Sequence, residues 1–263
     1  MPATGLAHDD AGHGPAVVLI HGHPFNRTMW APQLAAFRDR FRVIVPDLRG
    51  YGESPVTAGT VTMAELAADV RQLLDREGIG EAALVGLSMG GLILMELAAA
   101  EPDRWWALGF VATTARPTSP AEVADRLAKA QVAEEQGMRP LAEEMAARLF
   151  GPAPAEELTR QIMDMMLATS PLGAAAALRG RAQRPDYRPM LASLRTSTWV
   201  CVGDRDAYST GEVTDELVSC LHDPQVVVLP DVGHLPNLER TAVFNEYLGA
   251  FLDNAAALDK AEG

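Results

Sequence analysis

Short apolar runs and helical patterns alternate along most of the chain. The apolar runs are rich in branched residues and are bounded by glycine, proline or charged residues, as strands buried on both faces are. They cover residues 16–23, 42–50, 82–88, 105–113, 196–204 and 225–231. Segments with helical spacing of apolar residues follow them at residues 30–39, 63–76, 89–100, 210–221 and 238–252. This alternation predicts an α/β fold, with a mainly parallel central sheet flanked by helices.

The alternation stops between about Ala115 and Arg184, where the sequence carries no strand pattern. Proline and glycine divide this stretch into amphipathic helical segments. A helical insertion between two sheet strands predicts a cap, or lid, over the sheet. We therefore expect a core domain from residues 1–114 and 185–263, and a helical cap from residues 115–184.

Charge and cysteine content narrow the class of protein. The chain has 263 residues and a net charge of -13, which argues against nucleic acid and acidic membrane surfaces as partners. No stretch of about 18 apolar residues predicts a membrane span. The N-terminal segment lacks the basic start and apolar core of a signal peptide. Together with two free thiols, Cys201 and Cys220, this predicts a cytoplasmic protein.

The sequence GLSMGG, at residues 86–91, joins a strand pattern to a helical one. A G-x-S-x-G motif at such a joint is typical of the nucleophile elbow, a turn so sharp that the serine takes positive-φ geometry. Gly86 and Gly90 allow strand and helix to approach closely. The hydroxyl of Ser88 is then expected above the C-terminal edge of the sheet, at a helix N-terminus that favours an oxyanion.

A serine nucleophile needs a base, and the base needs an acid that orients it. In this type of fold the acid follows the serine in the chain and the histidine comes last. His234 lies between the last apolar strand and the last helix, so it is the predicted base. Asp204 and Asp206 both follow the preceding strand. We favour Asp206 as the acid, because it lies further from the strand and can curl back towards His234.

An oxyanion hole needs two backbone N–H groups aimed at one point. Met89, directly after the nucleophile, supplies the first. Pro24 has no N–H, which leaves His23 or Phe25 for the second, and we favour His23. The side chain of His23 either lines the pocket or only packs in the loop. His21 is interpreted as a structural residue that braces this loop.

The cap segments are rich in methionine, which indicates a mostly apolar pocket, although methionine clusters also fill cores. The residues expected to line the pocket are Pro24, Phe25, Met163, Met166 and Leu235. A basic stretch nearby consists of Arg179, Arg181, Arg184, Arg188 and Arg195. These arginines either bind a substrate carboxylate or form salt bridges between cap and sheet, and we favour salt bridges.

The motifs LIHGHP, VPDLRGYGES, VGLSMGG, VGDRD and GHLPNLE occur in this order within residues 16–252. Together they resemble the α/β-hydrolase fold superfamily, in its serine-nucleophile branch. The stretch GHLPNLERTAVFNEYLGAFL is most similar to 3-oxoadipate enol-lactonases and small esterases, and the His-Gly-x-Pro turn to cofactor-free haloperoxidases and perhydrolases. The resemblance implies a triad, two oxyanion donors, a cap, and neither cofactor nor metal. The triad is then Ser88, Asp206 and His234, and the donors are His23 and Met89.

The resemblance implies a hydrolase of small, mostly apolar carboxylic esters or lactones, with such a molecule as its partner. An enol-lactonase or C–C bond hydrolase with an anionic substrate, a non-catalytic ligand receptor and a homodimer stay open as alternatives. Aspartate-nucleophile hydrolases of this fold are disfavoured by Ser88, and hydroxynitrile lyases by the positions of Lys129 and Lys260. One departure concerns the start of the chain: family members open with a longer hairpin, so the first strand is expected to be missing or very short.

Overall fold

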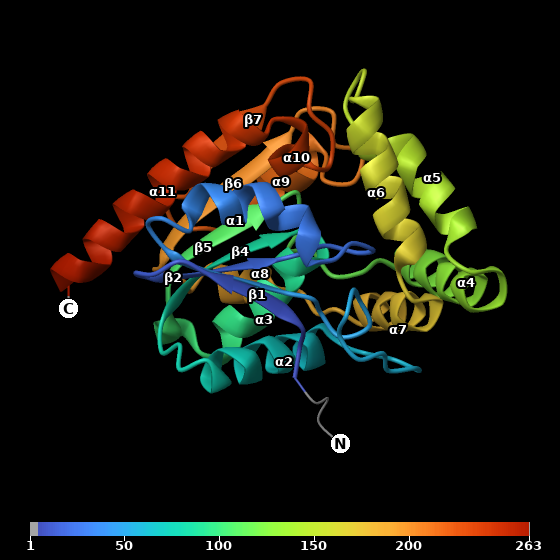
Figure 1. Cartoon of the computed structure of the whole chain (residues 1–263), viewed down its shortest axis with the longest axis horizontal. Helices are drawn as coiled ribbons and strands as arrows, with labels where there is room; N and C mark the ends of the chain where they lie inside the picture. The colour runs from blue at the N-terminus through green and yellow to red at the C-terminus, as the bar shows by residue number, and fades with distance from the viewer. Residues whose placement is uncertain (1–4, 263) are drawn as a thin grey trace.

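A twisted sheet forms the centre of the molecule (Figure 1). The computed structural model describes residues 5–262, so part of the N-terminal segment considered above lies outside the described residues. Within that range seven strands form one sheet, in the order β1-β3-β2-β4-β5-β6-β7. The strands are β1 (His8–Ala11), β2 (Ala16–Ile20), β3 (Arg42–Pro46), β4 (Ala82–Leu87), β5 (Trp105–Val111), β6 (Ser197–Gly203) and β7 (Gln225–Leu229). Only β1 runs antiparallel to its neighbour, which confirms the predicted α/β class.

Position in the sheet decides which strands are buried on both faces. Every residue of β2 and β4 is buried, because both strands lie in the middle of the sheet with helices over each face. Alternate residues divide between two apolar clusters: Val18 and Ile20 enter one, and Val17 and Leu19 enter the other. At the edge, β7 is largely exposed. The β1 strand is four residues long, so the expectation of a very short first strand is confirmed.

Helices cover both faces of the sheet (Figure 1). Two of them, α2 (Met63–Arg76) and α3 (Met89–Ala100), begin and end at the predicted residues. A capping box at Thr62 and Glu65 explains where α2 begins. The remaining sheet helices are α1 (Ala31–Phe37), α9 (Gly211–Ser219), α10 (Pro236–Glu239) and α11 (Thr241–Glu262). No helix among the described residues has the length and apolar character needed to cross a membrane.

Further helices lie between β5 and β6 and gather to one side of the sheet (Figure 1). They are α4 (Pro120–Gln136), α5 (Arg139–Leu149), α6 (Glu156–Ala168) and α7 (Pro171–Ala182), followed by the short α8 (Arg188–Leu191). The hydrophobic pattern did not predict α7. Its residues from Gly173 to Leu178 are all buried, so the helix has almost no polar face to give it a period.

Candidate active site

Ser88 lies in the turn between β4 and α3, in a backbone conformation that few residues other than glycine adopt. Its φ is 54° and its ψ is -110°. A Cβ at Gly86 would overlap the backbone of Gly90, and a Cβ at Gly90 would overlap the carbonyl of Ile20 in β2. Two strands and a helix therefore meet here at backbone distance, and the geometry of the predicted elbow depends on both glycines.

The structure brings His234 and Asp206 together on the loops that follow β7 and β6. The Nδ1 atom of His234 lies 2.9 and 3.0 Å from the two carboxylate oxygens of Asp206, and both side chains are buried. Burial alone would raise the pKa of Asp206. The nearby imidazole and the backbone N–H groups of Tyr208 and Ser209 outweigh burial and keep that pKa below its ordinary value. The ionised carboxylate thus fixes the proton of His234 on Nδ1 and leaves Nε2 as the free base.

Asp204, the alternative acid, is exposed and pairs with Arg205, whereas the His234 imidazole bonds Asp206. Its backbone N–H bonds Leu229 as the chain leaves the sheet, which turns the next residues back over the edge. The preference for Asp206 on the grounds of chain geometry agrees with this arrangement.

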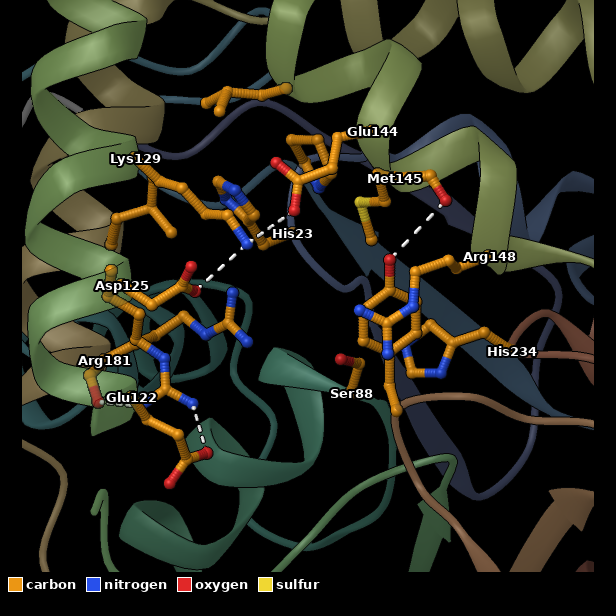
Figure 2. Close-up of a pocket in the computed structure, with 15 residues that line it drawn as sticks. His23, Ser88, Glu122, Asp125, Lys129, Glu144, Met145, Arg148, Arg181 and His234 are labelled. Atoms are coloured by element: carbon orange, nitrogen blue, oxygen red, sulfur yellow. Dashed lines mark hydrogen bonds and ion pairs between the residues drawn. The ribbon is translucent and has the colours of Figure 1, made fainter. Parts of the chain in front are cut away.

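Ser88 and His234 line the same cavity, whose volume is about 250 Å³. Figure 2 shows the Ser88 hydroxyl directed into this cavity, with the imidazole to one side. No hydrogen bond is formed between these two described side chains in the absence of substrate. The ring of Tyr208 packs on His234 with the ring centres 4.9 Å apart and holds the imidazole in place.

The N–H groups of His23 and Met89, the expected oxyanion donors, are both free of backbone partners within the described part of the chain. A Cβ added to Gly22 would come within 3.3 Å of the Ser88 Cβ, so the His23 loop runs directly beside the serine. Met89 is the first residue of α3, where unpaired N–H groups carry partial positive charge.

His21 and His23, which lie in the loop after β2, make different contacts. His21 donates through Nδ1 to the Gly22 carbonyl at 2.8 Å and accepts from the Leu48 N–H at 3.0 Å, which agrees with its interpretation as a brace. Burial lowers its pKa to about 4, so it stays neutral. The His23 side chain lines the cavity, and its Nδ1 lies 2.8 Å from the Tyr51 hydroxyl. Burial, and then the positive charge of Arg181, hold the pKa of His23 well below its usual range.

The cavity next to Ser88 is lined by both apolar and charged side chains, and most of the residues expected to line it lie elsewhere. Of the five predicted lining residues only Pro24 lines the cavity. Phe25, Met166 and Leu235 are fully buried in the core cluster that includes the β2 side chains, and Met163 packs against the same cluster. For the two methionines the reason is the orientation of α6, which turns its methionine face to the core rather than to Ser88.

Charged side chains from α4, α5 and α7 line much of the cavity, as Figure 2 shows, beside the apolar side chains of Leu141, Met145 and Leu178. The cationic ones are Arg126, Lys129, Arg148 and Arg181, and the acidic ones are Glu122, Asp125 and Glu144. The sequence analysis missed all of them except Arg181. A signal was present, because the α4 members recur at intervals of three and four residues and so share one helix face.

Glu239 is a further residue that the sequence analysis missed. Its carboxylate accepts hydrogen bonds from the N–H groups of Gly233 and Leu235, on either side of His234, at 3.1 Å. It also accepts from Gly151 at 2.7 Å, in the loop between α5 and α6. One carboxylate therefore fixes the His234 loop to the inserted helices. Among the described residues, no group of three or more His, Cys, Asp or Glu side chains could hold a metal ion.

Comparisons with known proteins cover nearly the whole chain. The profile described as "Alpha/beta hydrolase family" matches residues 17–247. 3-Oxoadipate enol-lactonase 2 of Acinetobacter baylyi is 31% identical, over 90% of this chain and 88% of its own. A thermophilic esterase from Thermogutta terrifontis, solved with malate bound, is 39% identical with a TM-score of 0.93, over 95% of this chain and 93% of its own. The enol-lactonase of Burkholderia xenovorans LB400 is 30% identical with a TM-score of 0.85, over 94% and 96%.

The close backbone contact at the elbow gives a prediction for stability. Gly90→Ala forces a methyl group against the Ile20 carbonyl, so we expect a loss of about 1–3 kcal/mol in the free energy of unfolding. The matched control is Gly80→Ala, because a Cβ at Gly80 meets no atom within 4 Å. Urea denaturation measures both. Equal stability of the two variants would contradict the packing described for the elbow.

Proposed function

The chain belongs to the alpha/beta hydrolase family, and on this premise we propose that it is a serine hydrolase of small carboxylic esters or lactones. The observation that carries the proposal is the strained Ser88 in a cavity that it shares with His234, whose other ring nitrogen bonds Asp206. The similarity to an esterase and to enol-lactonases supports the type of bond cleaved.

The first half of the proposed reaction forms an acyl-enzyme. Oγ of Ser88 attacks the carbonyl carbon of the substrate while Nε2 of His234 takes the hydroxyl proton. The oxyanion of the tetrahedral intermediate accepts hydrogen bonds from the N–H groups of His23 and Met89. The Asp206 carboxylate stabilises the imidazolium that forms. The imidazolium then protonates the leaving oxygen, the carbon–oxygen bond breaks, and the acyl group stays on Ser88.

The second half regenerates the enzyme. A water molecule gives a proton to Nε2 of His234 and attacks the acyl carbonyl carbon. The second tetrahedral intermediate uses the same two N–H groups. It collapses when the imidazolium returns a proton to Oγ of Ser88, which releases the carboxylic acid. With a lactone, acid and alcohol leave as one hydroxy acid.

We propose residues 115–184 as the cap and residues 1–114 and 185–263 as the core domain. The cap supplies one side of the cavity through α4, α5 and α7, and so controls which substrates reach Ser88. A volume of about 250 Å³ suits small substrates. The cytoplasmic location remains part of this proposal.

Turnover separates this proposal from a non-catalytic receptor with the same side chains, because a receptor binds a pocket ligand without cleaving it. We expect Ser88→Ala to reduce the hydrolysis of p-nitrophenyl butyrate about 10⁴-fold or more, since the mutation removes the nucleophile. Circular dichroism should be unchanged. Turnover close to that of the wild type would disprove the serine mechanism.

The two aspartates after β6 give a paired test of the acid. We expect Asp206→Asn to lower kcat by about 10⁴-fold, because an amide cannot hold the Nδ1 proton of His234 or stabilise its imidazolium. The exposed Asp204 pairs with Arg205 at the surface, so Asp204→Asn should change kcat by less than about threefold. The opposite order of effects would assign the acid to Asp204.

A further inference from the structure

We propose that Arg181 binds a carboxylate on the acyl part of the substrate, so that the enzyme prefers half-esters or lactones of dicarboxylic acids. This inference rests on the function proposed above and names its substrate class. It reverses the expectation that the basic stretch serves only structural salt bridges. The argument depends on which charges in the cavity already have partners.

Most of the charged side chains around the cavity are paired. The ammonium group of Lys129 lies 3.0 Å from Asp125 and 2.9 Å from Glu144, which uses both carboxylates. Glu122 is shared by two guanidinium groups: Arg126 at 3.2 Å and Arg184 at 3.6 Å. No acidic side chain of the cavity lining is therefore left without a cation.

Arg181 has no such partner. Among the described residues its guanidinium makes no ion pair or hydrogen bond, and its Nε is a buried donor without an acceptor. Burial, with Arg126 and Arg184 nearby, lowers its pKa to about 9, so the side chain is still charged at neutral pH. A buried cation without a partner costs free energy that a bound carboxylate recovers through paired N–H···O bonds.

The other arginines of the basic stretch have partners. Among the described residues Arg184 also keeps one buried donor without an acceptor, but it pairs with Glu122 at 3.6 Å and donates to the Arg116 carbonyl at 2.9 Å. Arg179 pairs with Glu134 at the surface, and Arg188 pairs with Asp186 and Glu216. Arg195 donates to backbone carbonyls. Salt bridges therefore account for much of the stretch, as expected, but not for Arg181. Arg148 also lines the cavity, but its guanidinium is exposed and lies 5.2 Å from the centre of the Tyr208 ring.

The position of Arg181 relative to the triad assigns the carboxylate to the acyl side. In Figure 2, Ser88 lies between the wall that carries Arg181 and the wall that carries His234. The leaving oxygen has to face His234, because the imidazolium protonates it. The acyl chain then extends the other way, towards Arg181. A second hollow of about 130 Å³ shares Ser88, Arg181 and His234 with the cavity and adds space beside the serine.

The test compares monomethyl glutarate with dimethyl glutarate, which differ in the charge of one end. We expect the wild-type enzyme to hydrolyse the anionic half-ester with a kcat/KM about tenfold higher or more. Arg181→Gln should lower kcat/KM for the half-ester about 10- to 100-fold, because it removes a charge-assisted pair. Its kcat/KM for the diester should change by less than about threefold. Acid release is followed by pH-stat titration at constant ionic strength.

Arg179→Gln is the matched control, since it removes an arginine from the same helix that pairs only at the surface. It should keep the preference for the half-ester. A purely structural role of Arg181 would lower the rates for both substrates equally, and that result would overturn the proposal. So would a wild-type enzyme without the preference, or a preference that survives Arg181→Gln.

Acetoxyacetate tests whether the carboxylate has to belong to the acyl part of the ester, because in this compound the carboxylate belongs to the alcohol part. We expect poor turnover, and a preference for acetoxyacetate over methyl acetate would contradict the acyl-side assignment. Ser88-dependent hydrolysis of p-nitrophenyl butyrate distinguishes failure of the Arg181 inference from failure of the proposed function. If it occurs without a charge preference, only the inference on Arg181 fails; if it does not occur, the proposed function fails as well.

Discussion

The backbone of Ser88 is the constraint on which the site depends. A non-glycine residue with φ of 54° and ψ of -110° costs on the order of 1–3 kcal/mol, so the surroundings have to hold it there. They do so with three hydrogen bonds: the Ser88 N–H donates to Val111 at 2.8 Å, and the Ser88 carbonyl accepts from Thr113 at 2.7 Å and from Gly91 at 3.0 Å. These bonds attach Ser88 to α3 and to the end of β5, and its hydroxyl enters the cavity.

A small set of hydrogen bonds also links the His234 loop to the inserted helices. The His234 N–H donates to the carbonyl of Leu149 in α5 at 2.7 Å, while Glu239 bonds the backbone on both sides of His234 and at Gly151. The helices that line the cavity are therefore fixed to the loop that carries the imidazole. The charged wall of the cavity and the His234 loop are thus held together by one set of hydrogen bonds.

The sequence predicted those parts of the molecule that local patterns determine. Strand order along the chain, the ends of α2 and α3, and the proximity of Asp206 to His234 follow from periodicity, capping and turn position. The lining of the cavity could not be predicted in this way. The sequence shows that α4 and α6 are amphipathic, but it does not show which face of each helix meets the cavity. Only the tertiary packing determines that the methionines of α6 face the core. The Ala-rich α7, which carries Arg181, was missed because a helix buried on nearly all sides has no polar period.

The central claim, that Ser88 becomes covalently acylated, is tested most directly by intact-protein mass spectrometry. Enzyme mixed with p-nitrophenyl butyrate and quenched in acid within milliseconds should gain the mass of one butyryl group. Peptide mapping should place that group on Ser88, because deacylation needs the folded site and stops in acid. Continued release of butyrate with no adduct on the protein, or an adduct on another residue, would contradict the account.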